Sequence, residues 1–464
     1  MREILERLVH NADGFVELRF HRQETRAFEV EKGRVENSIL SQRSGVGVRV
    51  LEQGTWGFAA TSDASEKAIA RAVEQARNAA RASATFRKAK LLGLPAATMA
   101  RGRFSEPGYD DLYRQPLEAK IQLAEEAERA ARAASPLIET ARSTYRELFE
   151  EKTIVTSDGA SCDLRLVRPE FRVNAVAVKN GDRATFSEMV GVTGGWDCAF
   201  RDASSQELAV RASRKAVDLA QAPYAPGGRF KVILAPSIVG LLVHEAIGHT
   251  VEADFVMAGS IAQGKLGQRV GSEFVTLCDS GASEYYAGAG GSIPVDDEGI
   301  LAGRTVIIRE GILESYLHIR ESAAHFGVAP TGNARAWAYA DEPLIRMRNT
   351  YIEPGDTSLE EMIAGIDDGF LLDGPLNGQA DATGEFMFAV ARAQRIKAGK
   401  LAEVVRGATV SGIAFDVLRS VDAVSREFKW DMGAGYCGKG QRMKVDAGGP
   451  YLRCEVLLGG QQLG

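Results

Sequence analysis

The stretch that decides the fold begins with Ala222-Pro-Tyr-Ala-Pro-Gly-Gly228, continues as Arg-Phe-Lys-Val-Ile-Leu234 and Ala-Pro236, and leads into Val243-His244-Glu-Ala-Ile-Gly-His249. Two prolines and two glycines within seven residues end any regular element, so residues 222–228 predict a linker. The apolar run at 230–234 predicts a short strand, and Pro236 suits the first turn of a helix. We therefore predict an N-terminal domain over residues 1–223 and a C-terminal domain over residues 229–464.

The N-terminal part mixes strand and helix patterns. Apolar residues alternate at 15–20, 27–31, 46–50 and 57–60, which predicts strands, and Lys32-Gly33 is typical of a hairpin turn. Asp63 and Glu66 form a capping-box pattern before an alanine-rich helix that ends near residue 82. Further helices are predicted over 117–134 and 206–221, with strands at 152–156 and 172–178 between them.

From about Gly299 onward the C-terminal part returns to strands, with hairpins predicted at Gly311 and Gly399. The predicted fold class is α+β with two domains. The first is a mixed α/β domain, and the second is a β-rich domain that carries one central helix.

The composition of the chain indicates which binding partners and which cellular compartment to expect. The chain has 464 residues, 45% hydrophobic and 25% charged, which is the balance of an ordinary globular protein. Its 56 basic and 62 acidic residues give a net charge of −6, and no basic block is present, so nucleic acid is not expected as a partner. No apolar window approaches the roughly 18 residues of a membrane span, and no secretory signal is visible. Five scattered cysteines without a Cys-x-x-Cys pair indicate reduced thiols in the cytoplasm.

The segment from His244 to His249 contains the candidate metal-binding and catalytic residues. Two histidines flank Glu245 at a spacing of five, in a chain with only six histidines. One interpretation is a capped helix whose histidines are satisfied by neighbouring carboxylates. The other is a zinc hydrolase, in which the imidazoles bind the ion and the glutamate accepts a proton from water.

The spacing of five predicts a local distortion. On a regular α-helix, residues five apart point about 140° from each other, so His244 and His249 could not both bind one ion. A single π-type turn, with a backbone hydrogen bond from i+5 to i, would bring the two rings together. Gly248 makes such a turn less costly because it lacks a Cβ atom.

A catalytic zinc site needs a third protein ligand. The candidates are Glu252, Asp254, His318, His325 and the five cysteines. Cys437 is the strongest on local grounds, because four glycines around it predict a tight exposed loop and Lys439 would favour its thiolate. An ordinary small residue in a turn explains Cys437 equally well.

Several motifs resemble the TldD branch of the TldD/PmbA metallopeptidases, over nearly the whole chain. The resemblance is carried by the following stretches: His244-Glu-Ala-Ile-Gly-His249-Thr-Val-Glu-Ala-Asp254, Gly264-Lys-Leu-Gly-Gln-Arg-Val-Gly-Ser272, Asp296-Asp-Glu-Gly299, Ala329-Pro-Thr-Gly-Asn333, Arg346-Met-Arg-Asn-Thr350, Gly378-Gln-Ala-Asp-Ala-Thr383, Cys437-Gly-Lys-Gly-Gln441, Gly45-Val-Gly-Val-Arg49 and Gly57-Phe-Ala59. The loop after Cys437 is one residue shorter than the family's frequent pattern.

The resemblance implies the roles of four residues. His244, His249 and Cys437 would bind Zn²⁺, and Glu245 would be the catalytic base. With the metal motif intact, the chain resembles the catalytic subunit, whose implied partner is a homologous subunit of the PmbA (TldE) type. A homodimer remains open, as related subunits share the surface that a two-fold interface needs.

The function predicted from these observations is zinc-dependent hydrolysis of peptide bonds in unfolded polypeptides and peptide precursors. A β-rich domain around the site suggests that an extended substrate adds as a strand. Arg346, Asn349 and Lys439 are candidates for contact with the substrate. Two alternatives are a non-catalytic interaction protein, in line with the family's older description as gyrase modulators, and a zinc hydrolase of another substrate class.

Overall fold

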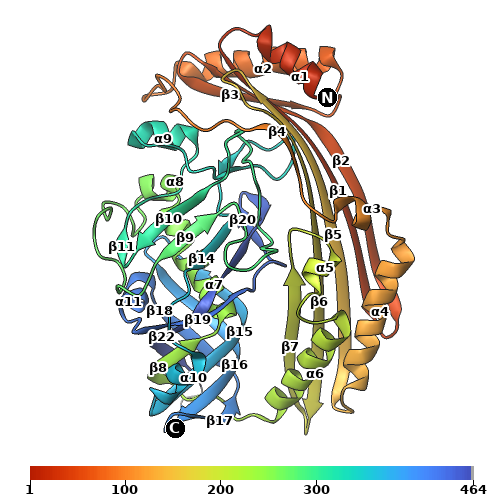
Figure 1. The fold of residues 1–464 in the computed structure, drawn as a ribbon, viewed down its shortest axis with the longest axis vertical. Helices are drawn as coiled ribbons and strands as arrows, with labels where there is room; N and C mark the ends of the chain where they lie inside the picture. Colours follow the sequence, from red (N-terminus) through yellow and green to blue (C-terminus); the bar gives the residue numbers. More distant parts are fainter. Residues whose placement is uncertain (461–464) are drawn as a thin grey trace.

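The computed structural model describes residues 1–460, which form two large sheets in the two halves of the chain. In Figure 1 the N-terminal sheet is the long curved layer on the right, and the C-terminal sheet lies at the lower left. The predicted mixture of helices and strands is confirmed. Among the described residues, no helix is both long enough and apolar enough to cross a membrane.

The N-terminal half contains these elements, in order: α1 (Arg2–His10), β1 (Phe15–Glu31), β2 (Arg34–Glu52), β3 (Thr55–Thr61), α2 (Glu66–Ala84), β4 (Arg101–Ser105), α3 (Tyr109–Arg114), α4 (Leu117–Ala133), β5 (Ile138–Thr156), β6 (Ser161–Lys179), β7 (Asp182–Gly191), α5 (Trp196–Ala199) and α6 (Ser205–Gln221). Seven strands form one sheet in the order β3-β2-β1-β5-β6-β4, with β7 also paired to β6. The turn between β1 and β2 lies at Lys32-Gly33 as predicted, with positive φ at both residues (53° and 73°).

The strands of this sheet are longer than the sequence pattern predicted. The two short strands expected at 15–20 and 27–31 are one strand, β1, and β5 and β6 each span 19 residues. Buried charged residues break the apolar alternation within these strands. In β5, for example, the carboxylate of buried Glu147 accepts hydrogen bonds from Tyr145 and Lys120. Strands that bury paired charges lose the period-two signal on which the prediction relied.

Helices cover part of this sheet. Helices α4 and α6 pack against its lower part through alanine-rich surfaces, and α2 packs on β2 and β3 (Figure 1). The cap of α2 differs from the prediction: Ser65, rather than Asp63, accepts a hydrogen bond from the N–H of Ala68 (3.3 Å). A complete capping box at Ser204 and Glu207 begins α6.

The C-terminal half contains these elements, in order: β8 (Gly228–Leu234), α7 (Pro236–Leu241), η1 (Leu242–Gly248), η2 (His249–Val251), α8 (Ala253–Met257), β9 (Leu277–Ser280), β10 (Arg304–Arg309), β11 (Ile312–Leu313), α9 (Arg320–Phe326), β12 (Ala334–Arg335), β13 (Leu344–Ile345), β14 (Asn349–Ile352), α10 (Leu359–Ala364), β15 (Asp368–Ala380), β16 (Glu385–Lys397), β17 (Lys400–Val405), β18 (Ala408–Ile413), α11 (Ala414–Arg419), β19 (Ala423–Trp430), β20 (Tyr436–Lys439), β21 (Gln441–Lys444) and β22 (Asp446–Gly459). Eleven of the strands form one sheet. The hairpins predicted at Gly311 and Gly399 are present.

A continuous helical segment, α7 followed by η1, runs against the C-terminal sheet. All six residues of α7 are buried, and its strongest contacts are with β22 and β15. The segment contributes to the largest apolar core of the molecule, together with residues of β8, β16 and β18. The core therefore fixes the helix that carries the histidine motif.

The segment 222–228 does not form a free linker. The N–H of Ala225 donates to the carbonyl of Arg406 (2.8 Å), and the N–H of Arg406 donates to the carbonyl of Pro223 (2.9 Å). These bonds attach the predicted linker to the C-terminal sheet.

Candidate metal centre

The helix that carries the histidines has the predicted distortion. Residues Leu242–Gly248 form a π-helical segment, and the N–H of His249 donates to the carbonyl of His244, five residues earlier. The prediction of an i+5 turn between the two histidines is confirmed. The extra residue brings the two imidazoles together, with ring centroids 5.2 Å apart.

Gly248 has a different role from the one that its lack of a Cβ atom suggested. Its backbone is ordinary right-handed helix (φ −55°, ψ −49°), so the turn requires no special conformation here. A Cβ atom at position 248 would instead lie 2.0 Å from the Sδ atom of buried Met347. Glycine is required because the helix packs directly on this side chain.

Three side chains converge beside the π-helical segment. One nitrogen from each of His244 and His249 and the Sγ atom of Cys437 lie within 4.8 Å of one another. The Nε2 atom of His249 is 3.1 Å from this sulfur. His244 is buried, and within residues 1–460 neither of its ring nitrogens has a hydrogen-bond partner. An unpaired buried imidazole is costly, whereas two imidazoles and one thiolate are a donor set that zinc accepts. The residues therefore fit the metal.

Cys437 lies in a strand, not in the exposed loop that its neighbouring glycines predicted. It is on β20, pairs with Met443 of β21 and is 5% exposed. Burial raises the pKa of the thiol, but His244 and His249 outweigh this effect and lower the pKa to about 5. The histidines, rather than Lys439, favour the thiolate.

A second layer of charged groups fixes the ring of His249. The Nδ1 atom of His249 is 2.9 Å from Oε2 of Glu252, which is fully buried. Lys439 donates to the same oxygen (2.9 Å), to Asp254 (2.7 Å) and to the carbonyl of Ile345 (3.1 Å). Such carboxylate–histidine contacts set the tautomer and orientation of a metal ligand.

The pKa values of this pair reflect the contacts. Burial alone would lower the pKa of His249, but Cys437 and Glu252 raise it to about 10. Burial would raise the pKa of Glu252, but His249 and Lys439 lower it. Without a metal, the centre therefore holds an imidazolium between a thiolate and a carboxylate.

Glu245 lies beside the centre and is partly exposed. Its side chain is 35% exposed, and its Oε2 atom lies 3.9 Å from Nε2 of His249, the nitrogen that also faces Cys437. The carboxylate is thus close to the donor cluster and also accessible to water, which is the arrangement that a general base requires.

The three residues considered for substrate contact lie in the framework of the site. Arg346 is buried and donates to the carbonyls of Cys437 and Gln441 (both 2.8 Å), so it supports the β20–β21 hairpin. Asn349 is buried and accepts from the N–H of Gly291 (2.9 Å). Lys439 is held by its two acidic partners. These contacts favour supporting roles for all three.

Of the other candidates for a third ligand, Glu252 lies behind His249 and Asp254 lies beyond Lys439. The Nδ1 atom of His318 is 3.2 Å from the hydroxyl of Ser322, and burial lowers the pKa of this histidine to about 4. Among the described residues, neither His318 nor His325 belongs to the donor cluster. The spacing of three between His249 and Glu252 was a signal for the second layer, because such residues are neighbours on a helix.

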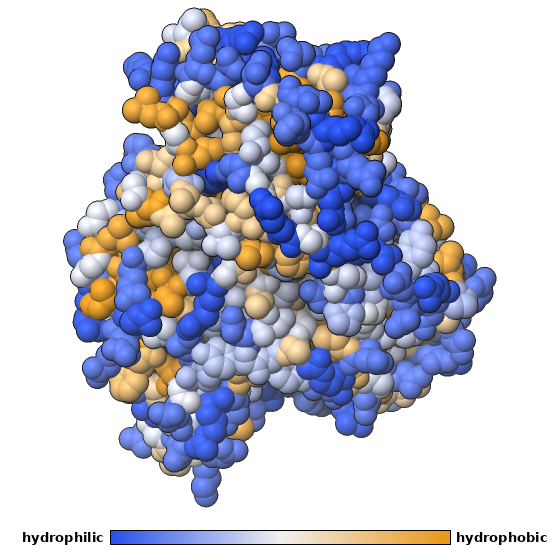
Figure 2. Space-filling view, turned by 45° about the horizontal axis from the view of Figure 1, so that its top comes forward, coloured by the Kyte–Doolittle hydropathy of each residue, from blue (hydrophilic) through white to orange (hydrophobic). Residues whose placement is uncertain are grey.

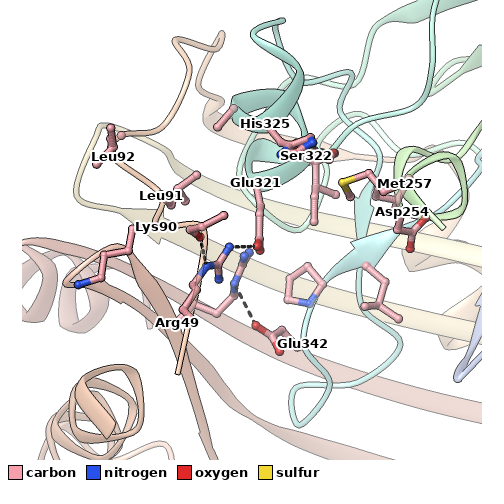
Figure 3. A pocket seen from close by; sticks show the side chains of 18 residues that line it. Arg49, Lys90, Leu91, Leu92, Asp254, Met257, Glu321, Ser322, His325 and Glu342 are labelled. Atoms are coloured by element: carbon pink, nitrogen blue, oxygen red, sulfur yellow. Dashed lines mark hydrogen bonds and ion pairs between the residues drawn. The ribbon is translucent and has the colours of Figure 1, made fainter. Parts of the chain in front are cut away.

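A cavity of about 620 Å³ lies next to this second layer (Figure 3). Its walls come from both halves of the chain: Arg87 and residues 89–93 on one side, and α9 and residues 342–345 on the other. Asp254 and Ile345 line it, and both contact Lys439. Figure 2 shows hydrophobic side chains gathered in the upper part of the view. Leu92, which lines the cavity, is 99% exposed.

Known proteins match the chain along nearly all of its length. Three family models match in order: the PmbA/TldA metallopeptidase domain 1 (residues 16–80), the central domain (110–220) and the C-terminal domain (227–459). A metalloprotease of Methanothermobacter thermautotrophicus is 34% identical and covers 96% of this chain and 95% of its own length. A metalloprotease TldD homolog of Haemophilus influenzae is 30% identical, with coverage of 98% and 95%. A zinc metalloprotease TldD homolog of Saccharolobus solfataricus is 29% identical over 89% of each chain.

Solved structures share the fold. TldE from Thermococcus kodakarensis superposes with a TM-score of 0.79 at 18% identity, covering 98% of this chain and 99% of that one. A Thermotoga maritima protein described as a proposed modulator of a DNA gyrase has a TM-score of 0.80 at 21% identity, with the same coverage. From the matching family models and the full-length relatives, the chain belongs to the PmbA/TldD family of metallopeptidases.

Proposed function

We propose that this chain is a zinc-dependent peptidase whose metal is held by His244, His249 and Cys437. The observation that carries the proposal is the buried His244, whose ring nitrogens have no partner in residues 1–460 although the donors of His249 and Cys437 lie within 4.8 Å. The competing interpretation, histidines satisfied by neighbouring carboxylates, accounts for His249, which contacts Glu252, but not for His244. The relative named a zinc metalloprotease supports the choice of metal.

The side chains have separate tasks in this proposal. Zinc, when bound, supplies Lewis acidity that activates water and polarises a carbonyl. The Glu245 carboxylate accepts a proton from the attacking water and donates it to the leaving amine. Glu252 keeps the Nδ1 nitrogen of His249 protonated, so that Nε2 is the free donor. Arg346 and Lys439 hold the hairpin that presents Cys437.

The proposed substrates are unfolded or flexible polypeptides and peptide precursors. Strands β20 and β21 pair only with each other among the described residues, so no further strand covers this hairpin, although Arg346 occupies the carbonyls of Cys437 and Gln441. An extended peptide would bind to an edge of this hairpin through backbone hydrogen bonds. Such binding selects flexible chains and depends only weakly on the identity of their side chains.

The proposal includes assembly and compartment. A peptidase with weak side-chain selectivity needs an enclosed centre, and we propose a dimer, either with a TldE-type subunit or with a second copy of this chain. The shared fold of TldE supports such a pairing. The five free thiols suit the cytoplasm. The proposed domains remain 1–223 and 229–464, joined at the segment 222–228.

The test combines metal analysis with cleavage. Purified protein should contain one zinc per chain and should cleave an unfolded fluorescent polypeptide faster than a compact folded one. Cys437→Ala and His249→Ala should lose the metal, whereas Cys454→Ala, a buried cysteine outside the centre, should keep it. Full zinc occupancy in Cys437→Ala would contradict the proposed ligand set. Zinc binding without cleavage of any polypeptide would contradict the proposed reaction.

A further inference from the structure

Three arginines without a carboxylate partner lie beside the hairpin that carries Cys437. They come from three different strands and are here called the arginine cluster: Arg43 on β2, Arg146 on β5 and Arg442 on β21. Within residues 1–460 none of the three forms an ion pair, although acidic residues outnumber basic ones in the chain (62 against 56). Unpaired arginines gathered in one place in an acidic protein indicate a site for an anion.

Two aromatic rings hold the arginine cluster together. The guanidinium of Arg442 lies over the ring of Tyr436 (3.8 Å to the ring centroid), and that of Arg146 lies over the same ring (5.2 Å). Trp337 packs edge-on against Tyr436, with ring centroids 5.7 Å apart. Arg43 and Arg442 lie over the Trp337 ring (5.4 and 6.0 Å). A guanidinium stacked on a ring keeps the N–H donors at its edge available for a planar anion such as a carboxylate.

Most of these donors have no partner in the protein. The side chains of Arg146 and Arg442 donate no hydrogen bond within residues 1–460, and the Nε atom of Arg146 is buried. Arg43 donates from Nε to Gln23 (2.8 Å). Burial lowers the pKa of Arg43, and the positive charge of Arg146 adds to the decrease, although Asp341 raises it. The arginines therefore act on one another as like charges.

The nearby carboxylates are engaged by other groups. Glu170 accepts hydrogen bonds from the hydroxyl of Tyr436 and from Lys444 (2.8 Å). Asp341 accepts from the N–H of Ala338 (3.0 Å). The cluster thus presents several charged donors without an acceptor from the described residues, and an anion from outside would complete it.

The arginine cluster lies one residue away from a proposed metal ligand. Tyr436 and Cys437 are neighbours on β20, so their side chains point to opposite faces of the hairpin. The end of the hairpin is bare, because a Cβ atom at Gly438 or Gly440 would meet nothing within 4 Å. Figure 1 shows β20 beside the curved N-terminal sheet, where Arg146 reaches Tyr436. Groups on the two faces of a sheet are roughly 10 Å apart, a distance that about three to four residues of extended chain span.

We infer that the arginine cluster binds a carboxylate of the polypeptide substrate, while a peptide bond about three to four residues away lies at the metal centre. This inference rests on the proposed peptidase function and adds a substrate class to it. The class is flexible chains that have an acidic side chain, or their terminal carboxylate, close to the cleaved bond.

Nucleic acid suits the cluster less well than a carboxylate. Single-stranded nucleic acids bind by stacking their bases on aromatic rings. Here each ring already has two guanidinium groups over it, which a base would have to displace. The net charge of −6 also repels a polyanion.

Equilibrium binding tests the cluster without requiring cleavage. Fluorescent peptides rich in Gly and Ser, with one Glu or one Gln and with a free or amidated C-terminus, are titrated into Glu245→Gln protein, and anisotropy gives the Kd. A peptide with a carboxylate should bind about tenfold more tightly than the amidated Gln peptide, as expected for a charge-assisted contact, and less so at high salt. A gain from Glu assigns the site to an acidic side chain, and a gain from the free C-terminus alone assigns it to the terminal carboxylate.

Substitutions in the same background locate the site. Arg442→Gln and Arg146→Gln should each remove most of the preference for the carboxylate. Arg229→Gln should keep it and is the matched control, because Arg229 is an exposed arginine on β8 without an ion pair among the described residues. Zinc content should be the same in all variants, since the arginine cluster lies on the face of the hairpin opposite Cys437.

Equal binding of the four peptides would overturn the inference, as would a preference that survives both substitutions. Tighter binding of a single-stranded oligonucleotide of the same length would also overturn it. Cleavage is measured separately with the wild type. Carboxylate-dependent binding without cleavage of any peptide would contradict the proposed function but not the carboxylate site.

Discussion

Replacing Lys439 with methionine tests whether the second layer supports the metal centre. The ammonium group of Lys439 is 2.9 Å from Oε2 of Glu252 and 2.7 Å from Asp254, and its side chain is only 12% exposed. Methionine keeps most of the volume and removes the charge. Glu252, fully buried, would then have His249 as its remaining charged partner, and its pKa should rise because Lys439 helps to lower it.

The expected loss is in zinc affinity. Removing an outer partner of a metal-bound histidine typically weakens metal binding by about 10–100-fold, which corresponds to roughly 1.4–2.7 kcal/mol. Stability should also fall, since breaking a buried ion pair costs about 3–5 kcal/mol when one charge stays behind. Because Lys439 retains slight exposure, we expect the lower end of that range.

Competition with a chelator measures the zinc affinity of each variant. The measurement is made at a temperature at which thermal unfolding curves show that every variant is folded. Lys429→Met is the matched control, because this lysine pairs with Asp431 (3.2 Å) and its side chain is 53% exposed. The double variant Lys439→Met/Glu252→Gln removes the uncompensated charge and should recover stability but not zinc affinity. If folded Lys439→Met binds zinc within twofold of the wild type, Lys439 does not act on His249 through Glu252.

The remaining predictions concern the base, the protons and the packing of the helix. Glu245→Gln should keep fold and zinc but lower the rate of polypeptide cleavage by about 10²–10⁴-fold; a rate within a few-fold of wild type would assign the proton transfer elsewhere. Zinc binding at pH 7 should release about one proton, since the pKa of about 5 makes Cys437 a thiolate already and the pKa of about 10 leaves His249 protonated. The apparent affinity for zinc should therefore rise between about pH 6 and 9. Calorimetry in buffers of different ionisation enthalpy measures the number of protons released, and a value of zero would contradict this prediction. Gly248→Ala should lower the free energy of unfolding by about 1–3 kcal/mol, because its Cβ would lie 2.0 Å from Met347 Sδ. Gly438→Ala is the control, because a Cβ atom there would meet no neighbour within 4 Å. Equal melting temperatures for the two variants would refute the packing argument.

The sequence was sufficient to predict the local features that depend on spacing. The turn at Lys32-Gly33, the helix after Pro236 and the i+5 turn between His244 and His249 all follow from backbone geometry, and all are present. These features involve residues close together in the chain. Cys437 entered the ligand set through its glycine-rich surroundings and the family resemblance, although its strand environment was not foreseen.

Features that depend on distant partners were not predictable in the same way. The full length of β5 and β6 was hidden because their charged residues are neutralised from elsewhere: Glu150 of β5 pairs with Arg168 of β6, and Lys152 pairs with Asp297. No spacing argument could connect Lys439 with Glu252 and Asp254, which are 187 and 185 residues away in the chain. One signal was available: residues two apart on a strand share a face, so Lys439 lies on the same face as Cys437.

The contacts between the two halves show why the metal helix depends on the whole chain. Lys152 of the N-terminal sheet donates to Asp297 (2.8 Å), and the same carboxylate accepts from the N–H of Ala336 (2.8 Å). The adjacent Arg335 donates to the carbonyl of Met347 (2.9 Å), whose side chain packs on Gly248 at the end of η1. Separation at the segment 222–228 would remove both Lys152 and Arg19 from Asp297. The N-terminal sheet is therefore part of the frame that positions the histidines, even though it contributes no donor to the centre.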